Sequence, residues 1–230
     1  EVGRRPSDEL RSILREAPAE RAPVSIAAVS EPVFRPPTTF GRESELATAL
    51  VALENPQAWV NLIGPIGIGK SHFAREIAWH FRQQTGLPVV QGLESNTPQG
   101  SLVLRLEELS PEQLGHAAES ARRLGHRLLT ISRANLGRED LSPIYLGPLP
   151  IPGSNQSPAE LRTYASVQLL LYGLDASIVD AFTESDWSAI RMIVQKLDGL
   201  PLALRLYGSR LRILTPSEIL QQWDKGFTEW

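Results

Sequence analysis

Residues 64–71 read GPIGIGKS, which matches the pattern G-x-x-x-x-G-K-[ST] in full. The glycines of this pattern let the backbone fold so closely that successive amide N–H groups point at phosphate oxygens. Lys70 would neutralise the terminal phosphates, and the Ser71 hydroxyl is placed to bind Mg²⁺. The positive end of the following helix attracts the same anion. The motif therefore predicts a loop that holds the phosphates of ATP or ADP.

The segments on either side of this loop are those that the motif requires. Residues 58–63 (AWVNLI) are typical of a short buried strand, and residues 70–84 indicate a helix that Gly86 stops. The alternative is a glycine-rich surface turn with a chance Lys-Ser pair, which this context disfavours. We therefore expect nucleotide contacts from the loop and the start of its helix, at Gly64, Ile66, Gly67, Ile68, Gly69, Lys70, Ser71 and His72.

The pattern of apolar residues predicts an α/β fold. Further strands are expected at residues 102–106, 127–132 and 144–146, with a helix at 44–53 ahead of the first strand and another at 111–124 between the strands. Beyond residue 152 no strand signal returns, and only helices are predicted, at 158–172, 176–182, 186–197 and 200–213. The expected fold is a P-loop NTPase parallel sheet flanked by helices, followed by a small helical subdomain.

Three regions follow from these patterns. Residues 1–38 are predicted to be an N-terminal helix, at residues 6–17, and a proline-rich linker. Residues 39–152 form the predicted α/β core. The predicted helical subdomain occupies residues 153–230 and includes the start of a next segment.

The composition narrows the range of partners and compartments. A net charge of −3 and a pI near 5.9 give no electrostatic reason to expect direct binding of nucleic acid. The chain has no cysteine, which excludes disulfides and thiolate metal sites and fits a reducing compartment. No apolar run reaches the roughly 18 residues of a membrane span, and the charged start is unlike a signal peptide. We expect a cytoplasmic protein without a membrane partner and, because residue 1 is not Met, a fragment of a longer protein.

Three further segments carry a family resemblance. Residues 40–46 read FGRESEL, residues 128–133 read LLTISR, and residues 199–204 read GLPLAL. Together with the phosphate loop, they resemble the STAND class of signalling NTPases, the group that contains the AP-ATPase or NB-ARC domains. The resemblance covers roughly residues 40–223.

The resemblance implies roles for particular residues. It implies that the backbone at Phe40 meets the base, that Arg42 contacts nucleotide and that Pro201 packs over it. It also implies that Arg133, at the end of a strand, faces the terminal phosphate. Each segment has a plainer interpretation: a capped helix start for FGRESEL, a helix–turn–helix joint for GLPLAL and a solvated side chain for Arg133.

The sequence departs from the family at the acidic residues. Members usually show a hydrophobic run that ends in paired acids, of which the first holds Mg²⁺ through water and the second can orient the attacking water. Here the candidates are Glu107 and Glu108, so that Glu107 would be the metal ligand, and Arg105 interrupts the run. A different register would put Arg105 at the acid position, and the two carboxylates could also be merely solvated.

A second departure concerns the connection ahead of these acids. Residues 92–101 alone separate the possible strand 87–91 from the strand that begins at Leu102. Parallel neighbours usually need a crossover of a dozen or more residues. We therefore expect either that residues 87–91 are not a proper strand or that they pair differently.

These observations favour an ATP/ADP-dependent signalling switch in which the nucleotide, with Mg²⁺, couples the α/β core to the helical subdomain. At most a slow ATPase activity is expected. By resemblance, the partners would be effector and sensor domains of the same longer protein, with homo-oligomers in the active state. The alternatives are a catalytically degenerate nucleotide-binding or interaction scaffold and, with less support, a P-loop kinase.

Overall fold

The computed structural model describes residues 38–94, 96–107 and 109–224. The predicted helix at residues 6–17, the proline-rich linker up to residue 37, and Glu108 lie outside this part of the chain. Within it, no helix is long and apolar enough to cross a membrane.

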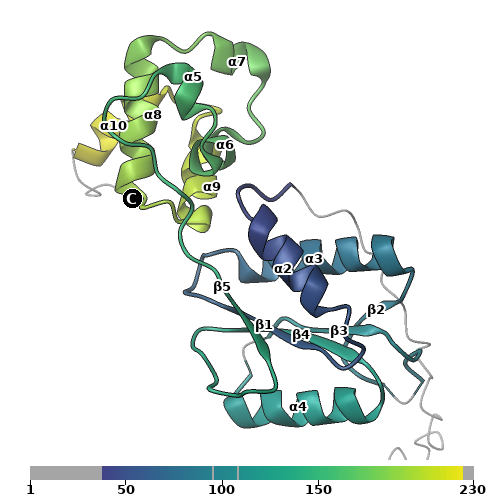
Figure 1. Cartoon of the computed structure of the whole chain (residues 1–230). Coiled ribbons are helices and arrows are strands. Elements are labelled where there is room, and N and C mark those ends of the chain that lie inside the picture. The colour runs from purple at the N-terminus through teal and green to yellow at the C-terminus, as the bar shows by residue number, and fades with distance from the viewer. Residues whose placement is uncertain (1–37, 95, 108, 225–230) are drawn as a thin grey trace, which may run out of the picture.

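A five-stranded sheet forms the first half of the structure (Figure 1). Its strand order is β2-β3-β4-β1-β5, and every pair of neighbours is parallel. Helices α2 and α3 cover one face and α4 covers the other. The strands are β1 (Trp59–Ile63), β2 (Val89–Gln91), β3 (Leu102–Arg105), β4 (Arg127–Ser132) and β5 (Ser142–Tyr145), and the helices are α2 (Glu43–Ala52), α3 (Lys70–Thr85) and α4 (Pro111–Arg123). The predicted fold class is confirmed.

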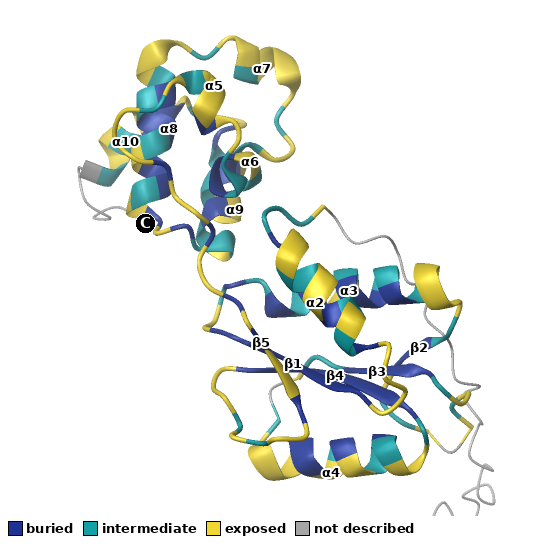
Figure 2. Ribbon diagram, viewed as in Figure 1, coloured by how far each residue is buried: buried dark blue, intermediate teal, exposed yellow. Residues whose placement is uncertain are grey.

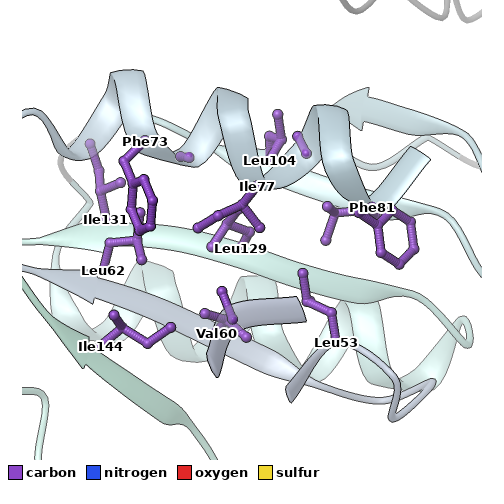
Figure 3. Packing of buried hydrophobic residues seen from close by; sticks show 14 of the residues in the cluster. Leu53, Val60, Leu62, Phe73, Ile77, Phe81, Leu104, Leu129, Ile131 and Ile144 are labelled. Carbon is purple, nitrogen blue, oxygen red and sulfur yellow. The ribbon is translucent and has the colours of Figure 1, made fainter. Parts of the chain in front are cut away.

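Strands β1 and β4 are buried and mostly apolar because helices cover both faces of the sheet. Every residue of β1 and of β4 is buried, as the dark strands of Figure 2 show. On one face, Ile77 of α3 points at Leu129 of the sheet, and Phe73 lies beside Ile131 (Figure 3). On the other face, Trp59 and Leu114 belong to a separate cluster under α4. This double layer holds the start of α3, and with it the phosphate loop, at the carboxyl end of β1.

The connection between β2 and β3 corrects the expectation from the sequence. Val89 pairs in parallel with Leu102, so residues 89–91 are a strand and the two strands are direct neighbours. No helix lies among the described residues of the connection. A strand as short as β2 spans only about 10 Å. The connection, residues 92–101, can extend to roughly 33 Å. It is therefore long enough to run from the end of β2 back to the start of β3.

The second half is a helical part with its own core. Trp187, Ile190 and Leu204 are buried together there with residues from all but one of its helices. The helices are α5 (Pro158–Leu161), α6 (Ala165–Leu171), α7 (Ala176–Asp180), α8 (Glu184–Lys196), α9 (Pro201–Arg210) and α10 (Pro216–Asp224).

One prediction for this part was wrong, and one helix was missed. Residues 158–172 form two helices, because Tyr164 has an extended backbone (ψ 128°) and the Thr163 hydroxyl bonds to Glu160 O. Helix α10 was not predicted. Its sequence signal is Thr215, whose hydroxyl accepts a hydrogen bond from Glu218 N while the Glu218 carboxylate accepts one from Thr215 N.

Backbone hydrogen bonds fix the helical part against the core. Leu149 N donates to Gly199 O at 2.9 Å, and Leu202 N donates to Gly67 O at 3.0 Å. The second bond joins the first turn of α9 directly to the phosphate loop. The segment that links β5 to α5 passes here from one part to the other, because Leu146 packs in the sheet core and Leu149 packs in the helical core. The amino end of α9 therefore lies over the loop.

His126, at the start of β4, makes stability depend on pH. Its side chain is 3% exposed, and burial lowers the pKa of its imidazole below the usual 6.5. Below pH 6.5 the imidazole of His126 takes up a proton more readily in the unfolded chain than in the folded chain. The stability from neutral His126 is therefore complete above that pH and decreases below it, by at most about 1.4 kcal/mol per pH unit.

We predict that His126→Gln flattens the decrease in the free energy of unfolding between pH 6.5 and 5. Denaturant unfolding at several pH values measures this slope. His116→Gln, on the exposed surface of α4, is the matched control and should leave the slope as in the unmodified chain. An identical slope in the His126 variant would contradict the prediction.

Candidate nucleotide-binding site

A cavity of about 440 Å³ lies where the phosphate loop, the segment before α2 and the helical part meet. Its size is that of a typical small-molecule site. Ten of the residues predicted from the sequence line it, namely Phe40, Arg42, Ile66, Gly67, Ile68, Gly69, Lys70, Ser71, His72 and Pro201. The remaining predicted residues, Gly64, Glu107 and Arg133, do not line it, and Glu108 is outside the described residues.

The phosphate loop has the backbone that its glycines allow. Gly67 and Gly69 have φ values of 80° and 93°, in the region that L side chains rarely adopt. Gly69 is the residue before α3, so the helix begins at Lys70 with its amino end directed at the cavity. Such a helix start attracts anions through its free N–H groups and its dipole.

Lys70 lies along the loop. Its Nζ donates to Gly64 O at 2.7 Å and to Pro65 O at 3.0 Å, and only 7% of the residue is exposed. Gly64 thus serves the site through its carbonyl, from behind the cavity lining. These two bonds hold a positive charge at the base of the loop, where phosphate oxygens would meet the loop amides.

Part of the cavity wall is apolar and aromatic. Phe40 contacts Tyr172 of the helical part edge to face, with 5.7 Å between ring centroids. Leu149 and Leu169 also line the cavity. A flat aromatic base fits such surroundings better than a charged group does.

Arg42 lines the cavity, but its guanidinium is already engaged. Nη1 donates to Glu45 Oε1 at 3.0 Å, and Nη2 donates to Gly147 O. The pKa of Glu45 is lowered, because hydrogen bonds from Ser44, its own backbone and Arg42, with the charge of Arg42, outweigh burial, which raises it. Arg42 therefore ties the segment before α2 to the link behind β5.

Helix α9 contributes a cation that the sequence analysis missed. Arg205 lines the cavity together with Pro201, one helical turn before it. Within the described part of the chain, no hydrogen bond or ion pair engages its exposed guanidinium. The i,i+4 spacing from Pro201 is a signal that could have revealed Arg205, because such residues share a helix face.

A buried chain of hydrogen bonds ties β4 to β1 beside the loop. Trp59 Nε1 donates to Thr130 Oγ1 at 2.9 Å, and that hydroxyl donates to Asn61 Oδ1 at 2.8 Å. Asn61 Nδ2 donates to Ser132 Oγ at 2.9 Å, and Ser132 donates to Ala134 O at 2.8 Å. The chain fixes the tip of β4, where the exposed Arg133 follows, at the edge of the sheet that carries the loop.

The acidic residue predicted to hold a metal points elsewhere. Glu107 Oε1 forms an ion pair with Arg105 Nη2 at 2.7 Å, and 52% of its side chain is exposed. Leu106 lines the cavity in its place and packs against the sheet core. The described donors do not fit the expected Mg²⁺ site, because Ser71 lines the cavity and the carboxylate of Glu107 does not.

The strand order and the glycine loop at the tip of β1 define a P-loop NTPase fold. Solved structures of similar fold include RuvB of Thermotoga maritima, described as a Holliday junction branch migration motor. That similarity covers 82% of this chain and 68% of RuvB, at 19% identity and a TM-score of 0.48.

Two other structures are similar. PCH-2 of C. elegans is 13% identical with a TM-score of 0.39, over 76% of this chain and 62% of its own. A chain of the E. coli MS115-1 HORMA:CdnC:Trip13 complex is 14% identical with a TM-score of 0.38, over 77% and 90%. Neither a protein-family profile nor a curated protein sequence matches this chain. At these identities the similarities concern the fold alone.

Proposed function

We propose that this chain is the nucleotide-binding switch of a STAND-type regulator, and that it binds ADP or ATP in the cavity. The observation that carries the proposal is the composition of the cavity wall. The phosphate loop supplies Lys70 from the core, and α9 supplies Pro201 and Arg205 from the helical part. A ligand that contacts both parts favours their docked arrangement, which is the thermodynamic basis of a switch.

The cavity wall offers one kind of surface for the phosphates of a nucleotide and another for its base. The helix start, Lys70 and Arg205 supply positive charge for phosphates. Phe40 and Tyr172 supply an apolar surface for the base. In this proposal residues 39–152 hold the nucleotide, and the helical subdomain from residue 153 moves relative to them.

Effector and sensor domains of a longer protein, and homo-oligomers of the active state, belong to the same proposal. They rest on the family resemblance of the three motifs. Arg133 would approach the terminal phosphate from the tip of β4. The buried hydrogen bonds that fix this tip support the role.

The second candidate is a nucleotide-binding scaffold without hydrolysis. The ion pair between Arg105 and Glu107 favours it, because it keeps a carboxylate needed for metal and water away from the loop. A P-loop kinase has less support, since the residues that follow the sheet form a packed helical core.

Nucleotide binding and turnover test these candidates together. Calorimetry with ADP and ATP should show saturable binding, and steady-state ATP hydrolysis should be far slower than about 1 s⁻¹, the low end of the usual enzyme range. A turnover at or above that value would contradict the switch with weak hydrolysis. Absence of binding to either nucleotide would contradict both candidates.

A further inference from the structure

The charges of the cavity are unusual for a site that takes a metal with its nucleotide. Among the described residues that line it there is no aspartate or glutamate, whereas Lys70 and Arg205 are cations. Arg42 also lines it, but Glu45 already pairs with that guanidinium. A Mg²⁺ ion prefers carboxylate and water oxygens and is repelled by nearby cations. The described lining therefore favours an anion without an accompanying metal.

The side-chain positions after β3 explain why no described carboxylate lines the cavity. Leu104 and Leu106 belong to the face that packs under α3, and Leu106 reaches the cavity. Arg105 and Glu107, the alternate residues, pair with each other away from it. Among the described residues after β3, the side chain on the cavity wall is thus the apolar Leu106 and not the carboxylate of Glu107.

We infer that this protein binds ADP and ATP as metal-free anions, with Arg205 supplying from α9 the counter-charge that Mg²⁺ would otherwise supply. The inference rests on the proposed function, since it concerns the same cavity. It gives the helical part a chemical role. When α9 undocks, the bound phosphates lose a cation that no metal replaces, so affinity should depend on docking.

The first test compares the dissociation constants of ADP and ATP in excess Mg²⁺ and in excess chelator, using calorimetry on the unmodified chain. We expect the two conditions to agree within about threefold, or about 0.65 kcal/mol. If Mg²⁺ tightens ATP binding by more than about threefold, the inference is overturned and the proposed function stands. If neither condition gives binding, the proposed function and the inference are overturned together.

Variants of Leu106 test whether this position removes the metal requirement. Leu106→Asp should make ATP binding stronger in Mg²⁺ than in chelator, because it places a carboxylate on the cavity wall near Ser71. Leu106→Asn introduces a side chain of the same shape as aspartate but without the charge, so its ATP affinity should be the same in Mg²⁺ and in chelator. If both variants respond to Mg²⁺ alike, the inference is overturned. The comparison on the unmodified chain decides the matter if either variant fails to fold.

Variants of the neighbouring acids and of Arg205 provide the remaining tests. Loss of a Mg²⁺ effect in Glu107→Gln or Glu108→Gln would identify a metal ligand and overturn the inference. Arg205→Ala should weaken both nucleotides in chelator by at least about threefold. Arg75→Ala removes an exposed cation from α3 outside the cavity lining and is the matched control. Equal affinities for these two variants would show that Arg205 supplies no counter-charge.

Discussion

Replacing Lys70 by alanine is expected to weaken the binding of ADP and ATP at least tenfold, or about 1.4 kcal/mol. The reason is the position of the Nζ atom, which the carbonyls of Gly64 and Pro65 hold at the base of the loop. Phosphate oxygens bound by the loop amides would meet this charge, and alanine leaves nothing in its place. Calorimetry measures the two affinities directly.

The same substitution leaves the loop carbonyls without their donor, so its effect on folding is measured separately. Thermal unfolding without nucleotide gives the intrinsic change in stability. Arg75→Ala, further along α3, is the control for loss of a cation from this helix, because among the described residues Arg75 donates only to Ser71 O, at 3.3 Å. If a folded Lys70→Ala protein binds both nucleotides as the unmodified chain does, the phosphate site lies elsewhere.

A larger effect is expected from Gly199→Ala, which should undock the helical part. Gly199 has a φ of 64°, and a Cβ atom there would lie 2.2 Å from Leu149 O. The clash is with backbone that cannot turn aside, so the link at Leu149 must move and the bond from Leu149 N to Gly199 O is lost. The left-handed backbone and the clash together cost roughly 2 to 4 kcal/mol.

Undocking has three measurable consequences. Nucleotide affinity should decrease, because Pro201 and Arg205 leave the cavity. Proteolysis within residues 150–158, where Gly153, Ser154 and Asn155 are exposed, should accelerate. ADP should no longer slow that cleavage, although it should slow it in the unmodified chain. In the unmodified chain, bound ADP should raise the free energy of unfolding by about 2.7 kcal/mol at a hundredfold excess over its dissociation constant. Gly199→Ala should lose this stabilisation.

Gly153→Ala is the matched control for this variant. It lies in the same link, and no atom lies within 4 Å of where its Cβ would be. It should leave affinity and cleavage close to those of the unmodified chain. If Gly199→Ala matches this control in all three measurements, contact between the two parts does not govern nucleotide binding, and the switch loses its mechanism.

Local chemistry was readable from the sequence. The residues GPIGIGKS determine a tight turn ahead of a helix, since the glycines permit positive φ and the helix start follows at once. Helix α4 begins at residue 111, as predicted, and Ser110 caps it through hydrogen bonds with Gln113, three residues away. Strand β4 has the predicted bounds because a mostly apolar run of that length fits a parallel sheet covered on both faces, where the hydroxyls of Thr130 and Ser132 form hydrogen bonds.

Other features depended on segments far apart in the chain. The sequence could not decide whether Glu107 faces the loop, because its direction follows from the alternation along β3 and from its pairing with Arg105. It gave Arg205 no role, since that residue reaches the cavity only when α9 lies over Gly67. The pairing of β2 with β3 likewise depended on how short β2 is in the assembled sheet.

The sequence by itself determined the phosphate loop, its flanking strand and helix, and the order of the elements, because these depend on interactions among residues a few positions apart. Tertiary structure alone decided which charges join Lys70 at the cavity: Arg205 lines it, and Glu107 does not. The physical reason is that a side chain's neighbours across a cavity are set by packing between distant segments, whose geometry no local pattern encodes.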